Sequence, residues 1–230
     1  MGEAVQGGMA ELARAPATHI LRLPDGLDAT TVAAVPINYG TAHRMLFTIA
    51  ALQVDELVLV LGASGGVGIA CVQYAKLAGA RVIAAAGSAE KCERLRALGA
   101  DFVIDYSCED FSRAAWKLSG KRGVDLVVNY TGGDTWEPSL RTLRKGGRLV
   151  TCGATAGFTA QTDIRYVWVR ELRILGSDGY TTEDIATSLR LVAEGKLKPV
   201  IDRVLPMQRA AEGHQLLENR AVFGKIVLSV

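Results

Sequence analysis

Two hydrophobic patterns alternate through the middle of the chain. Short continuous apolar runs, typical of strands buried on both faces, are separated by segments with helical spacing. The six runs cover residues 57–61, 81–86, 102–105, 124–129, 147–152 and 172–175. Because a predicted helix separates each run from the next, the connections are right-handed crossovers and the strands are parallel. The pattern predicts an α/β fold with a doubly wound parallel sheet of about six strands.

The two ends of the chain do not continue this alternation. Residues 9–27 are predicted to be extended, with two prolines and a turn at residues 24–26. Residues 200–230 are predicted to form a strand, a helix at about 207–218 and a final strand at 225–230. The ends therefore look like pieces of a second structural unit.

Composition and charge exclude several classes of protein. The chain has 230 residues, 49% of them hydrophobic, and a net charge of +2, which argues against a general polyanion binder and against global disorder. None of the four cysteines is close in sequence to another, so no spacing for structural zinc is present. Reduced cysteines and a first segment without the apolar stretch of a signal peptide predict a cytoplasmic protein.

The strongest local motif is the glycine-rich turn at residues 62–68, Gly-Ala-Ser-Gly-Gly-Val-Gly. It follows a predicted strand and opens a predicted helix, which is the context that dinucleotide binding requires. Gly65 allows close approach of a pyrophosphate, and Gly68 allows close packing of helix on strand. The residues predicted to contact the cofactor here are Ser64, Gly65, Gly66, Val67 and Gly68. A ligand-free turn and an S-adenosylmethionine site remain alternatives.

The second predicted strand bears on the choice of cofactor. An NAD site normally carries an acid about 20 residues after the turn, yet no acid occurs from Leu57 to Ala89. The strand is followed by Gly87 and Ser88, and then by Lys91, which could contact a 2′-phosphate by hydrogen bond and charge. The sequence therefore favours NADP(H) over NAD(H), although Lys91 could also be an ordinary solvated lysine.

Taken together, the motifs resemble the medium-chain dehydrogenase/reductase superfamily, and within it the zinc-free, quinone oxidoreductase-like branch. The resemblance covers nearly the whole chain, and its order and spacing are more specific than any single motif. It rests on the stretches at residues 36–42, 62–68, 86–91, 98–106, 146–150 and 224–228.

The resemblance implies further cofactor contacts. Tyr106 matches a tyrosine that reaches the adenosine phosphate of NADP, and Lys225 matches a basic position near the pyrophosphate. Asn38 and Thr41 match the segment that lines the nicotinamide. The ends of the fourth and fifth strands, where open sheets bind ligands, add Asn129, Thr131, Gly132, Gly153 and Thr155. Ordinary loop or core packing remains the alternative for each of these residues.

The resemblance also implies a domain division. Residues 1–35 would be a remnant of a GroES-like substrate domain, residues 36–176 the NADP-binding Rossmann domain, and residues 177–230 a segment that returns to the substrate domain. Most of a GroES-like domain would then be missing from the chain. In the zinc-dependent branch a cysteine ligand precedes the nicotinamide segment, but residues 32–35 are Val-Ala-Ala-Val. No catalytic metal is expected.

The expected activity is NADPH-dependent hydride transfer to or from a quinone, enone or carbonyl substrate. Tyr39 is the one candidate proton donor with motif support, whereas His43 is expected to be a surface or interface histidine. No hydrolase-like set of Ser, His and Asp is legible. Two alternatives stay open: a module that binds NADP(H) without turnover, and a zinc-dependent alcohol dehydrogenase.

The sheet also predicts a partner. The apolar strand at residues 172–175 would lie at an edge of the sheet, where unpaired backbone groups invite association with another strand. The resemblance implies that two subunits join through this edge. We therefore expect a homodimer and a small-molecule substrate, and neither a nucleic acid nor a membrane as partner.

Overall fold

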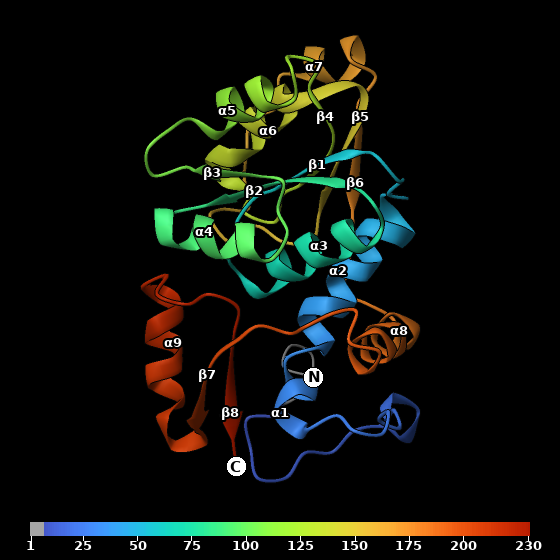
Figure 1. Ribbon diagram of the computed structural model, residues 1–230, viewed down its shortest axis with the longest axis vertical. Helices are drawn as coiled ribbons and strands as arrows, with labels where there is room; N and C mark the ends of the chain where they lie inside the picture. The colour runs from blue at the N-terminus through green and yellow to red at the C-terminus, as the bar shows by residue number, and fades with distance from the viewer. Residues whose placement is uncertain (1–6) are drawn as a thin grey trace.

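A six-stranded parallel sheet forms the centre of the computed structural model, which describes residues 7–230 (Figure 1). Its strands are β1 (Leu57–Val60), β2 (Arg81–Ala86), β3 (Phe102–Asp105), β4 (Val124–Val128), β5 (Leu143–Thr151) and β6 (Arg173–Gly176). They lie in the order β3-β2-β1-β4-β5-β6. This is the strand order of dinucleotide-binding Rossmann sheets. The predicted fold class and the edge position of the sixth strand are confirmed.

Helices cover both faces of the sheet (Figure 1). One face carries α2 (Thr41–His43), α3 (Gly66–Leu77) and α4 (Ala89–Ala97), and the other carries α5 (Phe111–Leu118) and α6 (Trp136–Thr142). Side chains of β1 alternate between two apolar clusters, with Val58 and Val60 in one and Leu57 and Leu59 in the other. Burial on both faces explains why this strand is a continuous apolar run.

The fifth strand begins earlier than the sequence indicates. The helix predicted at about residues 139–143 ends at Thr142, and β5 starts at Leu143 rather than Gly147. Leu143 pairs with Val124, after which the register shifts before Leu126 pairs with Arg148. Gly146 has a φ of 72°, a left-handed conformation that glycine tolerates. A bulge therefore continues the strand across glycines that the sequence suggests as a boundary.

The sequence analysis did not predict helix α8 (Thr182–Ala193). A capping box starts this helix: Asp184 Oδ2 accepts hydrogen bonds from the backbone N–H and the hydroxyl of Thr181, at 2.7 and 2.8 Å. The other carboxylate oxygen of Asp184 lies 2.6 Å from His43 Nδ1 on α2. Since Leu189 and Val192 join the apolar cluster beneath α3, α8 packs into the core of the central sheet.

A smaller unit follows α8 (Figure 1). Strands β7 (Ile201–Pro206) and β8 (Lys225–Ser229) pair in parallel and are connected through α9 (Ala210–Glu218). Gln73 on α3 joins the two units through two hydrogen bonds of 2.8 Å with the backbone of Lys198. The remaining elements are the 3-10 turns η1 (Ala17–His19), η4 (Gly133–Thr135) and η5 (Met207–Arg209), the π-helical turns η2 (Pro36–Gly40) and η3 (Arg44–Ile49), and helices α1 (Ala29–Ala33) and α7 (Ile164–Val169).

The domain division at residues 35 and 176 stays a prediction. Residues 1–6, which belong to the proposed N-terminal remnant and to the segment tested for a signal peptide, lie outside the described residues. In the part of the chain that is described, no helix is both long enough and apolar enough to span a membrane.

Candidate functional site

The candidate site lies along the carboxyl ends of the sheet strands. The strand order reverses between β1 and β4, and in open parallel sheets ligands bind in the crevice at this switch point. The predicted cofactor residues follow β1, β2, β3, β4 and β5, with additions from η2, α2 and the start of β8. The tertiary structure therefore gathers most of them at one edge of the sheet, in three groups.

The glycine-rich turn has the close packing that its sequence predicts. A Cβ atom on Gly68 would lie 2.6 Å from the Gly62 carbonyl oxygen and 2.6 Å from the Tyr130 hydroxyl. Gly62 has a φ of 58°, and its carbonyl accepts a hydrogen bond of 2.8 Å from Tyr130. Glycine at residue 68 thus allows α3 to start directly against the end of β1. Tyr130 closes the turn from β4 and was not identified in the sequence analysis.

Helix α3 begins without a side-chain cap. Gly65 is its N-cap residue, and no side chain within residues 7–230 accepts a hydrogen bond from its first turn. In contrast, α1, α4, α5, α7 and α8 each have a serine, threonine or aspartate cap. The N–H groups of Gly66 and Val67 therefore stay available at the positive end of a 12-residue helix. Such a helix end can bind an anion.

A cavity of about 400 Å³ opens at this helix end and brings residues from distant parts of the chain together. Asn38, Gly66, Gly224 and Lys225 all line it. Asn38 is 6% exposed and packs so closely on α3 that a Cβ on Gly66 would lie 2.3 Å from its Nδ2. Asn38, which the resemblance places at the nicotinamide, and Lys225, which it places at the pyrophosphate, thus border one cavity.

Lys225 gives this cavity a positive charge. Within residues 7–230 its ammonium has no acidic partner within ion-pair distance. Burial lowers the pKa of Lys225 from its ordinary value, because desolvation disfavours the charged form. A partly buried cation without an acidic partner among the described residues, next to an uncapped helix, forms an electrostatic environment suited to a phosphate group.

The second group lies at the ends of β2 and β3. Tyr106 packs against Gly87, where a Cβ would lie 2.9 Å from the tyrosine ring. Ser88 caps α4 by accepting a hydrogen bond of 3.3 Å from the backbone N–H of Lys91. The Lys91 ammonium donates to the Arg220 carbonyl at 2.5 Å. Lys91 is therefore held by a hydrogen bond to the chain, and this bond brings the backbone of Arg220 to this edge.

The third group follows β4 and β5, where the Asn129 side chain holds the loop after β4 by hydrogen bonds. Its side chain is fully buried, and its Oδ1 accepts hydrogen bonds from the backbone N–H groups of Thr131 and Gly132 at 2.9 and 3.0 Å. Its Nδ2 donates to Ser139 at 2.9 Å. The amide is thus used within the protein and shapes the loop. Gly132 and Gly153 line a second cavity, of about 430 Å³, and Thr155 is exposed beside it.

The remaining predicted residues are largely buried. Ser64 and Thr41 are 9% and 7% exposed. Tyr39 is 2% exposed and its hydroxyl donates to the Lys198 carbonyl at 3.2 Å. Burial raises the pKa of Tyr39 well above its usual range. This geometry points to a structural hydroxyl that holds the connection to β7, and it gives the predicted proton-donor role no support.

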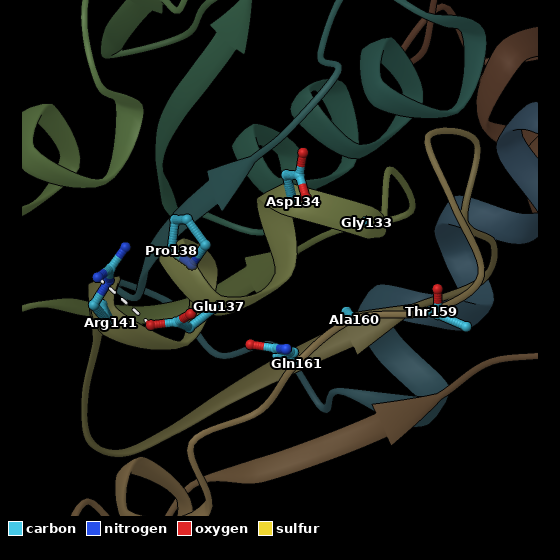
Figure 2. Close-up of a pocket in the computed structure, with 8 residues that line it drawn as sticks. All are labelled: Gly133, Asp134, Glu137, Pro138, Arg141, Thr159, Ala160 and Gln161. Atoms are coloured by element: carbon cyan, nitrogen blue, oxygen red, sulfur yellow. Dashed lines mark ion pairs between the residues drawn. The ribbon is translucent and has the colours of Figure 1, made fainter.

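A further cavity, of about 500 Å³, lies elsewhere (Figure 2). It is bordered by α6 and by residues 159–161, and its charged groups are Asp134, Glu137 and Arg141. None of the residues predicted from the sequence lines it. Size alone therefore does not identify the candidate site. His, Cys, Asp and Glu side chains form no group of three that could hold a metal ion within residues 7–230.

Two residues at the site were missed, for different reasons. Tyr130 directly follows the fourth predicted strand, so its position at the carboxyl edge could have been anticipated. Arg220 lies between α9 and β8, and nothing local in the sequence indicates that it meets α4. Only the pairing of β7 with β8 and the contact to Lys91 bring it to the edge.

The fold and these groups define a dinucleotide-binding α/β unit. The model of the zinc-binding dehydrogenase family matches residues 66–194. The chain belongs to this family, and its relatives support the quinone oxidoreductase-like branch of the medium-chain superfamily. It is 31% identical to the quinone oxidoreductase of Homo sapiens over 231 residues, covering 97% of this chain and 70% of that protein.

Solved structures agree with this assignment. A crystal structure described as an NAD-dependent alcohol dehydrogenase matches with a TM-score of 0.94 and 41% identity, over 100% of this chain and 67% of the other. A 2-octenoyl-CoA carboxylase reductase, in complex with NADP and 2-octenoyl-CoA, matches with a TM-score of 0.84 and 31% identity, over 90% and 51%. The chain spans 54% to 66% of the length of the first curated relatives it matches.

Proposed function

We propose that this chain binds NADP(H) and serves as the cofactor-binding part of an oxidoreductase. The reaction would be hydride transfer between the nicotinamide and a quinone, enone or carbonyl substrate. The observation that carries the proposal is the cavity shared by the uncapped N-terminus of α3 and Lys225. Two relatives support this proposal: one is named a quinone oxidoreductase, and another was solved in complex with NADP.

The residues at this cavity would bind the diphosphate. The N–H groups of Gly66 and Val67 would donate to its oxygens, and Lys225 would neutralise part of its charge. Gly65 lacks a side chain that could block the approach, since a Cβ there would meet only the Gly62 carbonyl, at 3.4 Å. These features fit a dinucleotide better than the alternative of a ligand-free turn, because a ligand-free turn does not explain a half-buried lysine that has no acidic partner within residues 7–230.

Selection of NADP(H) over NAD(H) would come from the group at β2 and β3. No carboxylate between Leu57 and Ala89 repels a 2′-phosphate. Ser88 accepts from the Lys91 backbone, so its hydroxyl hydrogen can be donated to a phosphate. Lys91 lies beside it and supplies a charge, and its contact with the Arg220 carbonyl brings the backbone of residue 220 to the same region. A solved relative is described as NAD-dependent, so NADH is the essential comparison.

The bound cofactor would supply or accept the hydride, and the protein would position the reacting groups. Thr131 and Thr155, at the carboxyl ends of β4 and β5, border the region where a nicotinamide would lie. Asn129 holds the β4 loop through the N–H groups of Thr131 and Gly132. Hydroxyl and N–H donors at these loops would stabilise the enolate or alkoxide that develops on the substrate.

A titration of NADPH and NADH tests cofactor binding and selection. Nucleotide fluorescence should give a lower Kd for NADPH in the wild-type chain. Arg220→Ala with Lys91→Ala should weaken NADPH roughly tenfold, about 1.4 kcal/mol, and change NADH less than twofold. Lys145→Ala, a surface change on β5, is the matched charge control. Tighter binding of NADH than of NADPH would contradict the proposed selection.

Turnover is tested separately, because a module can bind NADP(H) without catalysis. NADPH consumption should be followed with a simple quinone and with an enoyl thioester. Turnover supports the oxidoreductase, whereas tight NADPH binding without turnover of either substrate supports the binding module. Zinc bound in a one-to-one ratio, with activity that chelators remove, would instead support a zinc-dependent alcohol dehydrogenase.

We also propose that two copies pair through strand β6. This strand lies at the sheet edge, and Ile174 on it is 40% exposed. Trp168 and Val169, at the end of α7, add exposed apolar surface beside it. Light scattering after size exclusion should give a dimer, and Ile174→Lys should give a monomer. A wild-type monomer at micromolar concentration would overturn this proposal.

A further inference from the structure

We propose that the groove between α5 and α6 binds a phosphorylated nucleotide at a second site, separate from the glycine-rich turn. The groove has a volume of about 440 Å³. The helices that border it, α5 and α6, cover the face of the sheet opposite α3 (Figure 1). Cations dominate its lining, which consists of Asp110, Ser112, Arg113, Trp116, Lys117, Lys121 and Arg141. A volume of this size suits a nucleotide-sized ligand.

The positive charge of this groove is local and only partly compensated. Residues 111–123 contain four Lys and Arg residues and no acid, although the whole chain carries only +2. Arg122 pairs with Asp125 at 2.8 Å, whereas Lys117 and Lys121 have no acidic partner within ion-pair distance among residues 7–230. Asp110 accepts hydrogen bonds from the backbone N–H groups of Ser112 and Arg113 at 2.8 and 3.2 Å, so it is used as the cap of α5. The Asp110–Arg113 ion pair, at 3.7 Å, is exposed and therefore weak.

Trp116 adds a planar aromatic surface to these charges. Its side chain is half-buried, and the Arg170 guanidinium carbon lies 6.0 Å from the ring centre. Arg170 Nη1 donates to the carbonyls of Arg141 and Leu143 at 2.8 and 2.9 Å, which holds this guanidinium in place. Aromatic rings stack on nucleobases, and Lys and Arg bind phosphates. The combination therefore suits a base that carries phosphate groups.

The surroundings favour one compact ligand over an extended polyanion. At Arg141 the groove borders the cavity of Figure 2, where Asp134 and Glu137 contribute negative charge. Glu137 also lies 3.6 Å from Arg141. A nucleic acid or a long acidic peptide that extended past Arg141 would meet these carboxylates. A nucleotide with its phosphates near Lys117 and Lys121 would not.

Calorimetry with adenosine 3′,5′-bisphosphate tests the site. Lys117→Ala with Lys121→Ala should weaken its binding at least tenfold, whereas Lys145→Ala should not change it. Lys225→Gln removes the cation of the other cavity and should also leave this binding unchanged, so failure of the NADP(H) proposal stays distinguishable. Equal binding to wild type and to the Lys117/Lys121 variant, or loss of binding in Lys225→Gln alone, would overturn the second site.

Further probes test recognition of the base. Trp116→Leu should weaken adenosine 3′,5′-bisphosphate several-fold and leave inorganic pyrophosphate unchanged. Pyrophosphate that binds the wild type as tightly as the nucleotide would overturn the assignment of a nucleotide ligand, as would preference for an acidic peptide. Coenzyme A distinguishes two sources of the ligand. If it binds as tightly as the bisphosphate, the groove accepts the nucleotide end of a larger molecule. If it binds more weakly, the ligand is a free nucleotide.

Discussion

Gly65 and Gly224 form a parallel β-bridge although they lie in distant parts of the chain. The Gly224 N–H donates to the Ser64 carbonyl at 3.0 Å, so the last strand begins against the glycine-rich turn. Gly224 has a φ of 103°, and a Cβ there would lie 2.3 Å from the Val200 carbonyl oxygen. This backbone contact brings the next residue, Lys225, to the cavity at the start of α3.

Gly68→Ala should disturb both the fold and the cofactor site. The new Cβ would lie 2.6 Å from the Gly62 carbonyl and from Ala63 Cα, and backbone atoms cannot move aside as a flexible side chain can. We expect a loss of about 1–3 kcal/mol in the free energy of unfolding, with weaker NADPH binding. Urea unfolding measures the first effect. Gly176→Ala, where no atom lies within 4 Å, is the control, and equal stability of the two variants would contradict the packing argument.

Lys225→Gln should weaken NADPH binding roughly tenfold to a hundredfold, because it removes a charge that would contact the phosphate. The variant should lose no stability, because the charge that it removes is partly desolvated in the folded protein. Burial lowers the pKa of Lys225 from 10.5. Below the folded-state pKa, the cost of desolvating the charged ammonium therefore lowers the stability of the folded protein in full. As pH rises through that pKa towards 10.5, the penalty disappears and the unliganded protein becomes more stable.

Deprotonation of Lys225 also removes the charge that would meet the phosphate. NADPH affinity of the wild type should therefore fall as pH rises through the same window, whereas Lys225→Gln should lack this dependence. Fluorescence titrations from neutral to alkaline pH measure both proteins. Identical pH profiles in the two proteins would argue against a role for Lys225 in binding.

Tyr39→Phe should cost stability and leave catalysis unchanged. The variant loses the hydrogen bond of 3.2 Å to the Lys198 carbonyl, and one such bond contributes about 0.5–1.5 kcal/mol. Thermal unfolding measures this loss, and kcat with the best substrate measures catalysis. A fall in kcat of tenfold or more, at unchanged NADPH affinity, would restore Tyr39 as the proton donor.

Asp184→Asn should loosen α8 from α2, with a loss of about 1–3 kcal/mol at neutral pH. Burial alone would raise the pKa of Asp184, but hydrogen bonds from Thr181 and His43 outweigh it and lower the pKa below 3.8. Stability from the carboxylate is thus present above 3.8 and lost as pH falls through the lowered value. Unfolding measured from pH 7 downwards should show the two proteins converging, and a constant gap would contradict this origin.

Much of the central sheet follows from local pattern. The run Leu57 to Val60 is apolar at every position because both sides of β1 are covered, and Ser88 caps α4 as its sequence position indicates. The start of β5 did not follow from the local pattern, because the strand continues across Gly146 and begins at Leu143. Helix α8 was missed although its capping box, formed by Thr181 and Asp184, is local. The contact of Asp184 with His43, on another element, then holds the helix against α2.

The sequence by itself determined the class of the fold, the glycine-rich turn and the absence of an acid after it, because each depends on neighbouring residues. Tertiary structure decided which distant residues share a cavity: Asn38, Gly66 and Lys225 meet only through the packing of η2 on α3 and the bridge at Gly224. It also buried Tyr39, a tyrosine that its motif alone suggests for catalysis. Burial and long-range contacts depend on how the elements pack, and no local pattern encodes that packing.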